Sequence, residues 1–205
     1  PTSPRGCPAC LTFHVKRLDE YQELLATTGV EWGLIGPREV DRLWERHIDN
    51  CLAVTEDVQC LPQSCSVVDV GSGAGLPGVV WAIARPDLTV TLVEPLERRV
   101  KFLDLAVREL ALMNVRLLRG RAQEVDIRGD RVTARAVAAT KTLLPWLAPL
   151  VSQGGRMVLL KGMKADQELR DAGPWLQRSG WSAVVREVGD PPRTRVVVVE
   201  RRVKG

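Results

Sequence analysis

Beyond residue 65, short apolar runs alternate along the chain with stretches of helical periodicity, and this alternation narrows the possible folds more than any other feature. Such a pattern predicts a largely parallel sheet with helices on both faces. The expected strands are residues 67–70, 89–94, 115–119, 131–137, 156–161, 181–187 and 195–200. The expected helices are residues 78–84, 96–113, 141–151 and 164–179. Residues 66–205 are therefore predicted to form an α/β core.

The last two expected strands have little but the turn-rich residues 189–194 between them. A connection this short cannot make a parallel crossover, so the two strands should pair antiparallel. A dinucleotide-binding Rossmann sheet continues with parallel strands. A seven-stranded, Rossmann-like sheet with an antiparallel terminal hairpin is instead the plan of class I methyltransferases, whose methyl donor is S-adenosyl-L-methionine. We expect that plan here.

The first third of the chain has the periodicity of helices. Larger apolar side chains recur every three or four positions over residues 11–27, and a second helical pattern begins at Pro37 and continues to Leu52. We expect these helices to form an N-terminal cap, residues 11–65, on a single methyltransferase domain that spans residues 11–205. Residues 1–10 are expected to be a disordered tail. A length of 205 residues suits one domain.

The strongest local signal lies at residues 68–78, where an apolar strand runs into glycines at alternate positions. Gly71 and Gly73 let the chain turn tightly and let a ligand approach the backbone. Asp69 can hold the amino acid part of the cofactor or, alternatively, cap the glycine turn. From Gly73 the spacing also fits the dinucleotide fingerprint Gly-x-Gly-x-x-Gly. The glycines alone therefore leave open another nucleotide binder, or a fold that has lost its cofactor.

Glu94 is the second cofactor signal, because it ends the second expected strand, 23 residues after Gly71. An acceptor at this place can bind both hydroxyls of a ribose. A dinucleotide and S-adenosylmethionine both carry such a ribose. The length of the chain and its terminal hairpin then disfavour a dehydrogenase, so the expected cofactor is S-adenosylmethionine.

Six segments of the chain share their order and spacing with one known family. They are residues 43–48 (LWERHI), 68–78, 98–103 (RRVKFL), 120–124 (GRAQE), 135–138 (RAVA) and 160–162 (LKG). Over roughly residues 20–200 the chain resembles the bacterial 16S ribosomal RNA guanine-N7 methyltransferases, the GidB-type family. The resemblance implies methylation of guanine N7 in small-subunit (16S) ribosomal RNA.

Position by position, the resemblance implies roles for individual residues. Gly71 and Leu76 would contact the cofactor, Ala122 and Gln123 would flank its adenine, and Arg135 would reach the methyl-transfer end. The chain departs from the family's Arg-His-Ile-Leu-Asp-Ser pattern at residues 46–51, which read RHIDNC. Such a departure affects the detailed contacts near the cofactor and not the class of reaction.

The chemistry at guanine N7 needs no general base, because this nitrogen carries a free lone pair at neutral pH. Catalysis then consists of alignment and exclusion of water, and alignment alone can supply roughly 7–11 kcal/mol. We expect Arg135 and Lys161, at the carboxyl ends of central strands, to be catalytic, and Lys161 and Arg193 to bind RNA. For each of them the alternative is a solvated charge at the end of a strand.

Charge and composition support an anionic partner and an intracellular enzyme. Residues 1–66 carry a net charge of −4 and residues 67–205 one of +8, and 23 of the 29 basic residues are arginine. Arginine usage of this kind also fits a GC-rich genome. No apolar run approaches the length of a membrane span, and residues 1–10 lack a signal pattern. Cys7 and Cys10 lack a second cysteine pair, so no metal site is expected.

The sequence therefore predicts a cytoplasmic, monomeric methyltransferase that acts on ribosomal RNA or on the small ribosomal subunit, without a membrane or a metal. One alternative is a methyltransferase of the same fold that acts on another RNA, a protein or a small molecule. Another is a non-catalytic, RNA-binding ribosome assembly factor that keeps the fold.

Overall fold

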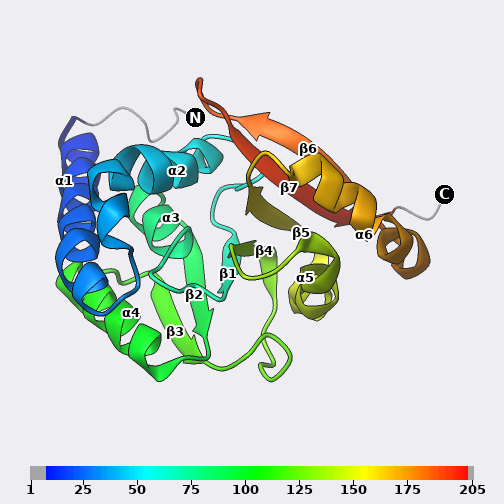
Figure 1. Cartoon of the computed structure of the whole chain (residues 1–205), viewed down its shortest axis with the longest axis horizontal. Coiled ribbons are helices and arrows are strands. Elements are labelled where there is room, and N and C mark those ends of the chain that lie inside the picture. The colour runs from blue at the N-terminus through cyan, green and yellow to red at the C-terminus, as the bar shows by residue number, and fades with distance from the viewer. Residues whose placement is uncertain (1–7, 203–205) are drawn as a thin grey trace.

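The computed structural model describes residues 8–202, and a seven-stranded sheet runs through its centre (Figure 1). The strand order is β3-β2-β1-β4-β5-β7-β6. The strands are β1 Ser66–Val70, β2 Thr89–Glu94, β3 Val115–Arg119, β4 Gly129–Arg135, β5 Val151–Lys161, β6 Trp181–Val188 and β7 Thr194–Arg201. The first five strands pair parallel, whereas β7 pairs antiparallel with both β5 and β6. The predicted α/β plan and its antiparallel terminal hairpin are confirmed.

Helices cover both faces of the sheet, as the parallel strands require. On one face lie α3 (Gly78–Ala84) and α4 (Glu97–Glu109), and on the other α5 (Thr140–Leu147) and α6 (Ala165–Ser179) (Figure 1). Alternate residues of one strand serve the two faces: Val158 packs in the core under α3, and Leu159 packs in the core under α5 and α6. The period-2 alternation of side chains thus fills two apolar cores from one strand.

The N-terminal segment forms a helical cap on the α3 side of the sheet. It consists of α1 Pro8–Leu24, the π-turn η1 Leu25–Gly29, the 3-10 turn η2 Pro37–Arg42, the π-turn η3 Trp44–Ile48 and α2 Asp49–Thr55. The predicted second helix is confirmed as helical over residues 37–55, but it changes from 3-10 to π to α geometry along its length. Of the predicted tail, residues 8–10 belong to α1, and residues 1–7 lie outside the described part of the chain.

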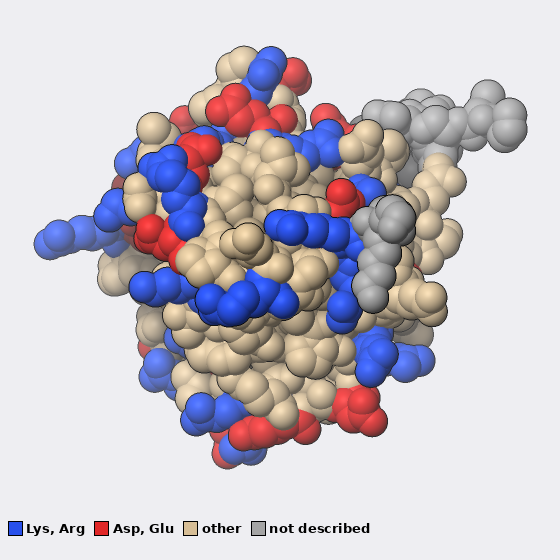
Figure 2. Space-filling view, turned by 90° about the vertical axis from the view of Figure 1, so that its right-hand side faces the viewer, with Lys and Arg blue, Asp and Glu red and all other residues tan. Residues whose placement is uncertain are grey.

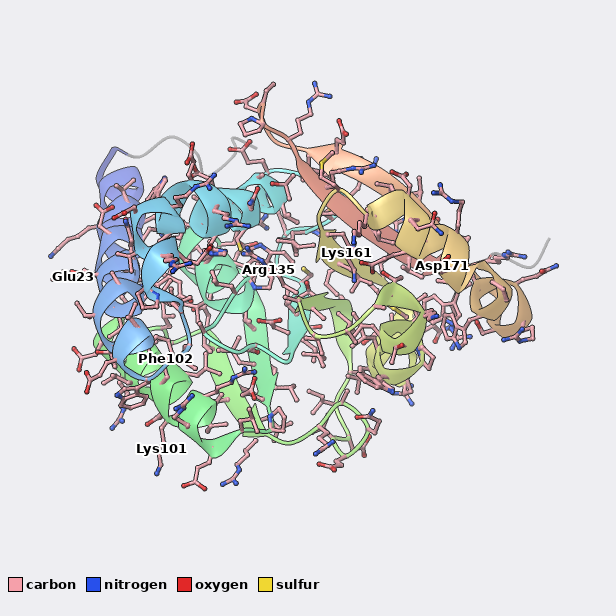
Figure 3. All side chains as sticks on the ribbon, viewed as in Figure 1. Glu23, Lys101, Phe102, Arg135, Lys161 and Asp171 are labelled. Carbon is pink, nitrogen blue, oxygen red and sulfur yellow. The ribbon has the colours of Figure 1, made fainter. Side chains whose placement is uncertain are left out.

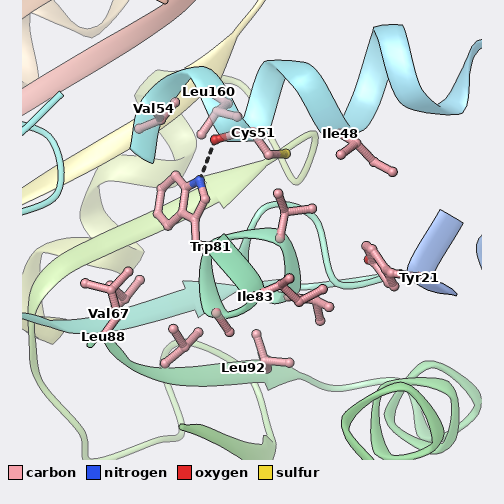
Figure 4. Packing of buried hydrophobic residues seen from close by; sticks show 14 of the residues in the cluster. Tyr21, Ile48, Cys51, Val54, Val67, Trp81, Ile83, Leu88, Leu92 and Leu160 are labelled. Carbon is pink, nitrogen blue, oxygen red and sulfur yellow. Dashed lines mark hydrogen bonds between the residues drawn. The ribbon is translucent and has the colours of Figure 1, made fainter. Parts of the chain in front are cut away.

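Two buried hydrogen bonds fasten the cap to the core, and Figure 4 draws the one between Trp81 and Cys51. The indole N–H of Trp81 in α3 donates to the carbonyl of Cys51 in α2 at 2.8 Å. The hydroxyl of Tyr21 in α1 donates to the carbonyl of Ala74 in the loop after β1 at 2.6 Å. Both donors are fully buried, so each bond satisfies a polar group that would otherwise be costly to bury. The cap is therefore held next to the glycine loop.

Several predicted boundaries shift in the structure. Strand β4 ends at Arg135 rather than at residue 137, because Ala136 turns the chain with φ +56°. The helix expected over residues 141–151 ends at Leu147, and β5 begins at Val151. The helix expected to reach residue 113 ends at Glu109. Only the first of these shifts affects the site, because the turn after Arg135 carries Val137 over the glycine loop.

Candidate active site

The loop between β1 and α3 needs glycine at specific positions. Gly71, Gly73 and Gly75 have φ of +68°, +59° and +98°, a backbone region that other residues rarely adopt. A Cβ on Gly71 would lie 2.6 Å from a methyl carbon of Val137, and one on Gly75 would lie 2.5 Å from a methyl carbon of Val79. The loop is therefore fixed in shape by its neighbours as well as by its own backbone.

A cavity of about 720 Å³ opens above this loop, at the carboxyl ends of the parallel strands. Seven of the eight residues predicted to bind a cofactor line it: Gly71, Gly73, Leu76, Glu94, Ala122, Gln123 and Arg135. These residues come from four separate segments of the chain. Parallel strands bring their carboxyl ends to one edge, where ligands of open α/β sheets bind. We call this space the first cavity.

Glu94 is held in place by the backbone. One carboxylate oxygen accepts the N–H of Gly73 at 2.9 Å, and the other accepts the N–H of Leu96 at 3.0 Å. The side chain is 1% exposed, yet it lines the first cavity. Each oxygen retains a free lone pair after its backbone bond, so the carboxylate can still accept two hydroxyl donors from the cavity side.

Asp69 departs from the expectation that it holds the amino acid part of a cofactor. Its carboxylate is fully buried and does not line the first cavity. One oxygen accepts the N–H of Gly78 at 3.0 Å, at the start of α3. Burial raises the pKa of Asp69 to about 7. In this structure Asp69 has the alternative role weighed for it, which is to cap the glycine turn.

A second cavity, of about 650 Å³, adjoins the first and shares Arg135, Ala136 and Val137 with it. Its walls carry five basic side chains and one acidic side chain: Arg46, Arg135, Lys161, Arg193, Arg195 and Glu168. The predicted RNA-binding residues Lys161 and Arg193 both lie here, and neither lines the first cavity. Figure 3 shows Arg135 beside α2 and Lys161 on the side toward α6. Sequence reasoning missed Arg46, Arg195 and Glu168, although Arg46 belongs to the recognised segment 43–48.

Arg135 connects the two cavities and also holds the cap. Its guanidinium donates to the carbonyls of Arg46 and His47 at 3.3 Å each and lies 3.4 Å from the sulfur of Cys51. It also lies 2.6 Å from Nδ1 of His47. The π-turn η3 supplies these carbonyls. The position of Arg135 is therefore set by the cap as well as by β4.

The contacts of His47 fix its protonation state. An arginine only donates, so Nδ1 of His47 must accept, and the imidazole is neutral. Its proton is then on Nε2, which lies 3.1 Å from a carboxylate oxygen of Glu39. Burial and the Arg135 charge lower the pKa of His47, which outweighs the opposing effect of Glu39. Glu39 thus orients neutral His47, which in turn orients Arg135.

This arrangement predicts a loss of function at low pH. Because the pKa of His47 is lower in the fold than its ordinary value of 6.5, protonation favours the unfolded chain. The stabilisation is complete above pH 6.5 and declines as the pH falls below it. We expect methyl transfer to fall over the same range, since the imidazolium repels Arg135. In His47→Asn, whose amide oxygen can replace Nδ1, the pH–rate profile should lose this acid limb; an unchanged limb would contradict the assignment.

Lys161 and Glu168 form a partly buried ion pair on the opposite wall of the second cavity. Nζ of Lys161 donates to Oε2 of Glu168 at 2.9 Å and to the carbonyl of Ala138 at 3.3 Å. The Lys161 side chain is 9% exposed. Burial tends to raise the pKa of Glu168, but bonds from Thr140 and Lys161 outweigh it and lower that pKa. Glu168 is therefore ionised at neutral pH.

The strand order, the glycine loop and the cavity lined by Glu94 are those of a class I methyltransferase, which uses S-adenosylmethionine. The family model GidB, described as rRNA small subunit methyltransferase G, matches residues 14–186. The chain belongs to this family and is an enzyme. A "Ribosomal RNA small subunit methyltransferase G" of Thermobifida fusca is 54% identical over 185 residues, covering 87% of this chain and 77% of that protein. The protein of the same name from Salinispora arenicola is 49% identical, covering 98% and 88%.

Solved structures share the fold at low sequence identity. A methyltransferase from Pyrococcus furiosus superposes with a TM-score of 0.63 at 15% identity, covering 76% of this chain and 83% of that one. The TYW2 protein of M. jannaschii in complex with AdoMet superposes with a TM-score of 0.58 at 17% identity, covering 77% and 76%. Within residues 8–202, no helix has the length and apolar character to cross a membrane. The same residues contain no cluster of three potential metal ligands, and Cys7 lies outside them.

Proposed function

We propose that this chain transfers the methyl group of S-adenosylmethionine to N7 of a guanine in small-subunit ribosomal RNA. The observation that carries the proposal is that the first cavity and the basic second cavity meet at Arg135. A donor in one cavity and an acceptor base in the other would be adjacent there. The family match supplies ribosomal RNA as the class of acceptor.

The first cavity fits S-adenosylmethionine by its shape and its acceptors. A Cβ on Gly71 would meet the side chain of Val137, so glycine at this position keeps the loop in the shape that lines the cavity. The Glu94 carboxylate suits the two ribose hydroxyls, and Ala122 and Gln123 lie where the adenine would pack. When bound, the cofactor supplies an electrophilic methyl group on a positively charged sulfur.

The residues around the acceptor base orient it and shield it from water, and none of them has to remove a proton. Guanine N7 attacks with its lone pair, so a hydrogen-bond donor on N7 would block the reaction. Arginine commonly contacts guanine at both O6 and N7. Arg135 and Lys161 are therefore restricted to O6 or to a phosphate. Because Arg135 already donates to the cap, it is poised to orient the base rather than to enclose N7.

The surroundings of the second cavity suit an RNA backbone. Arg46 and Arg193 are exposed at its rim and can reach phosphates of an RNA. Contacts of this kind supply much of the affinity of a protein for a nucleic acid. A base splayed out from an RNA loop could enter the cavity while Arg46 and Arg193 hold its flanking phosphates. Further lysine and arginine side chains lie across the side of the molecule that is on the right of Figure 1 (Figure 2). We also propose that the enzyme acts as a monomer in the cytoplasm.

Cleavage at N7-methylguanine tests this proposal directly. Small-subunit RNA is purified from cells with and without the gene, reduced with borohydride and treated with aniline. We expect cleavage at one guanine in RNA from cells that have the gene, and no cleavage there in RNA from cells that lack it. Identical patterns from the two strains would refute the proposal. If calorimetry also shows no binding of S-adenosylmethionine at millimolar concentration, a non-catalytic assembly factor would be the better account.

A further inference from the structure

The second cavity contains one feature that phosphate binding does not explain. Among its basic side chains lies a carboxylate, Glu168 of α6, whose side chain is 30% exposed. A carboxylate repels phosphates, so its presence in a site for RNA calls for a different partner. Guanine offers one, because its Watson–Crick edge carries two adjacent donors, N1–H and the N2 amino group.

The hydrogen bonds of Glu168 leave one oxygen for such a partner. The N–H of Thr140 donates to Oε2 at 3.0 Å, the hydroxyl of Thr140 donates to it at 2.7 Å, and Lys161 donates to it at 2.9 Å. All three bonds converge on Oε2. Within the described part of the chain, Oε1 has no hydrogen-bond partner, and it is not a buried atom. The carboxylate is thus fixed by one oxygen and open at the other.

We propose that Glu168 reads the target guanine by accepting hydrogen bonds from its N1–H and N2 amino groups in the second cavity. The inference rests on the proposed function and names the residue that selects the base. Lys161, which holds Glu168, can donate a remaining proton to O6 of the same base.

The reaction chemistry is consistent with this placement. N7 must stay free of donors, so selection has to use another edge of the purine. The Watson–Crick edge lies away from N7, and Glu168 lies on the α6 side of the cavity, whereas Arg135 lies on the cap side where the first cavity begins. A guanine held by Glu168 can therefore present N7 toward the first cavity. An adenine has an acceptor at N1 and no N2 amino group, so Glu168 would reject it.

Inosine in place of the target guanosine tests the inference, because inosine lacks only the N2 amino group. The substrates are two small-subunit RNA fragments that differ at the one nucleotide located by the cleavage assay. For the unaltered enzyme we expect kcat/KM to be about 10- to 100-fold higher for the guanosine RNA, as for a lost hydrogen bond to a charged group. In Glu168→Gln that ratio should fall toward one.

The control is Asp166→Asn, which removes an acidic partner of Arg195, another side chain of the second cavity, without altering the cavity wall itself. We expect its guanosine-to-inosine ratio to stay at the value of the unaltered enzyme.

Equal rates on both RNAs with the unaltered enzyme would overturn the inference. A Glu168→Gln enzyme that slows both RNAs by the same factor would also overturn it, because Glu168 would then serve only α5 and Lys161. If thermal melting shows that Glu168→Gln does not fold, the same ratio is measured with Glu168→Ala. The proposed function is tested separately, by the cleavage assay on RNA from cells with and without the gene.

Discussion

Gly71→Val should abolish binding of S-adenosylmethionine, with an affinity loss of at least about 100-fold. Gly71 has φ +68°, where a β-branched residue is strained by about 1–3 kcal/mol. Its new Cβ would lie 2.6 Å from a methyl carbon of Val137, and overpacking of this kind costs about 1–3 kcal/mol more. The loop or Val137 must move, and both line the first cavity. Isothermal titration calorimetry with the cofactor measures the effect.

Gly154→Val provides the matched control for this substitution. Gly154 also has a positive φ, +76°, but a Cβ there would meet nothing within 4 Å. It lies early in β5, near the end of the strand that is remote from both cavities. We expect this variant to lose stability in thermal melting and to keep its cofactor affinity. If Gly71→Val is folded and binds the cofactor as tightly as the unaltered chain, the assignment of the loop is wrong.

Arg135→Ala should lower kcat/KM for methyl transfer by about 100-fold or more, the usual effect of removing a positioned donor from an active site. Among residues 8–202, Arg135 is the one charged side chain that lines both cavities, and the substitution removes it. It also leaves the carbonyls of Arg46 and His47 without their donor, so we expect a loss of about 2–4 kcal/mol in unfolding free energy. Single-turnover methylation and chemical denaturation measure the two effects.

Arg131→Ala separates the structural loss from the catalytic loss. Arg131 also projects from β4 and also binds cap carbonyls, those of Cys60 at 2.7 Å and Gln59 at 3.2 Å, but it lines neither cavity. Its removal should destabilise the fold by a similar amount and change kcat/KM by only a few-fold. Equal losses of activity in the two variants would show that Arg135 acts solely as a fastener of the cap.

Much of the fold was predictable because local patterns determine it. The short connection between the last two strands forces antiparallel pairing, and the structure shows that pairing between β6 and β7. The sequence did not reveal that β7 lies between β5 and β6, because strand order depends on packing. The second cap helix was predicted correctly as continuous, but its π-helical stretch η3 was not predicted. Carbonyls of η3 accept hydrogen bonds from Arg135, and the bond to His47 spans 88 residues of the chain.

For the site, most residues of the first cavity were predictable, whereas only Arg135, Lys161 and Arg193 of the six charged residues of the second cavity were predicted. Gly71 and Glu94 follow strand ends, and parallel strands bring such ends together whatever the details of packing. Asp69 follows the same rule, but its side chain points into the core and caps α3, which only packing could decide. Glu168 is the clearest omission, because a glutamate within a helical pattern has no local signal of a site.

The sequence by itself determined the strand plan, the glycine loop and the family, since each depends on residues that are neighbours in the chain or lie at fixed strand ends. Tertiary structure alone decided which partners Arg135, His47 and Glu168 have. These side chains are flexible, and their contacts join η3, β4, β5 and α6 across long sequence separations. Such contacts form only when the cap and both helical layers have packed on the sheet, so no local pattern of residues could encode them.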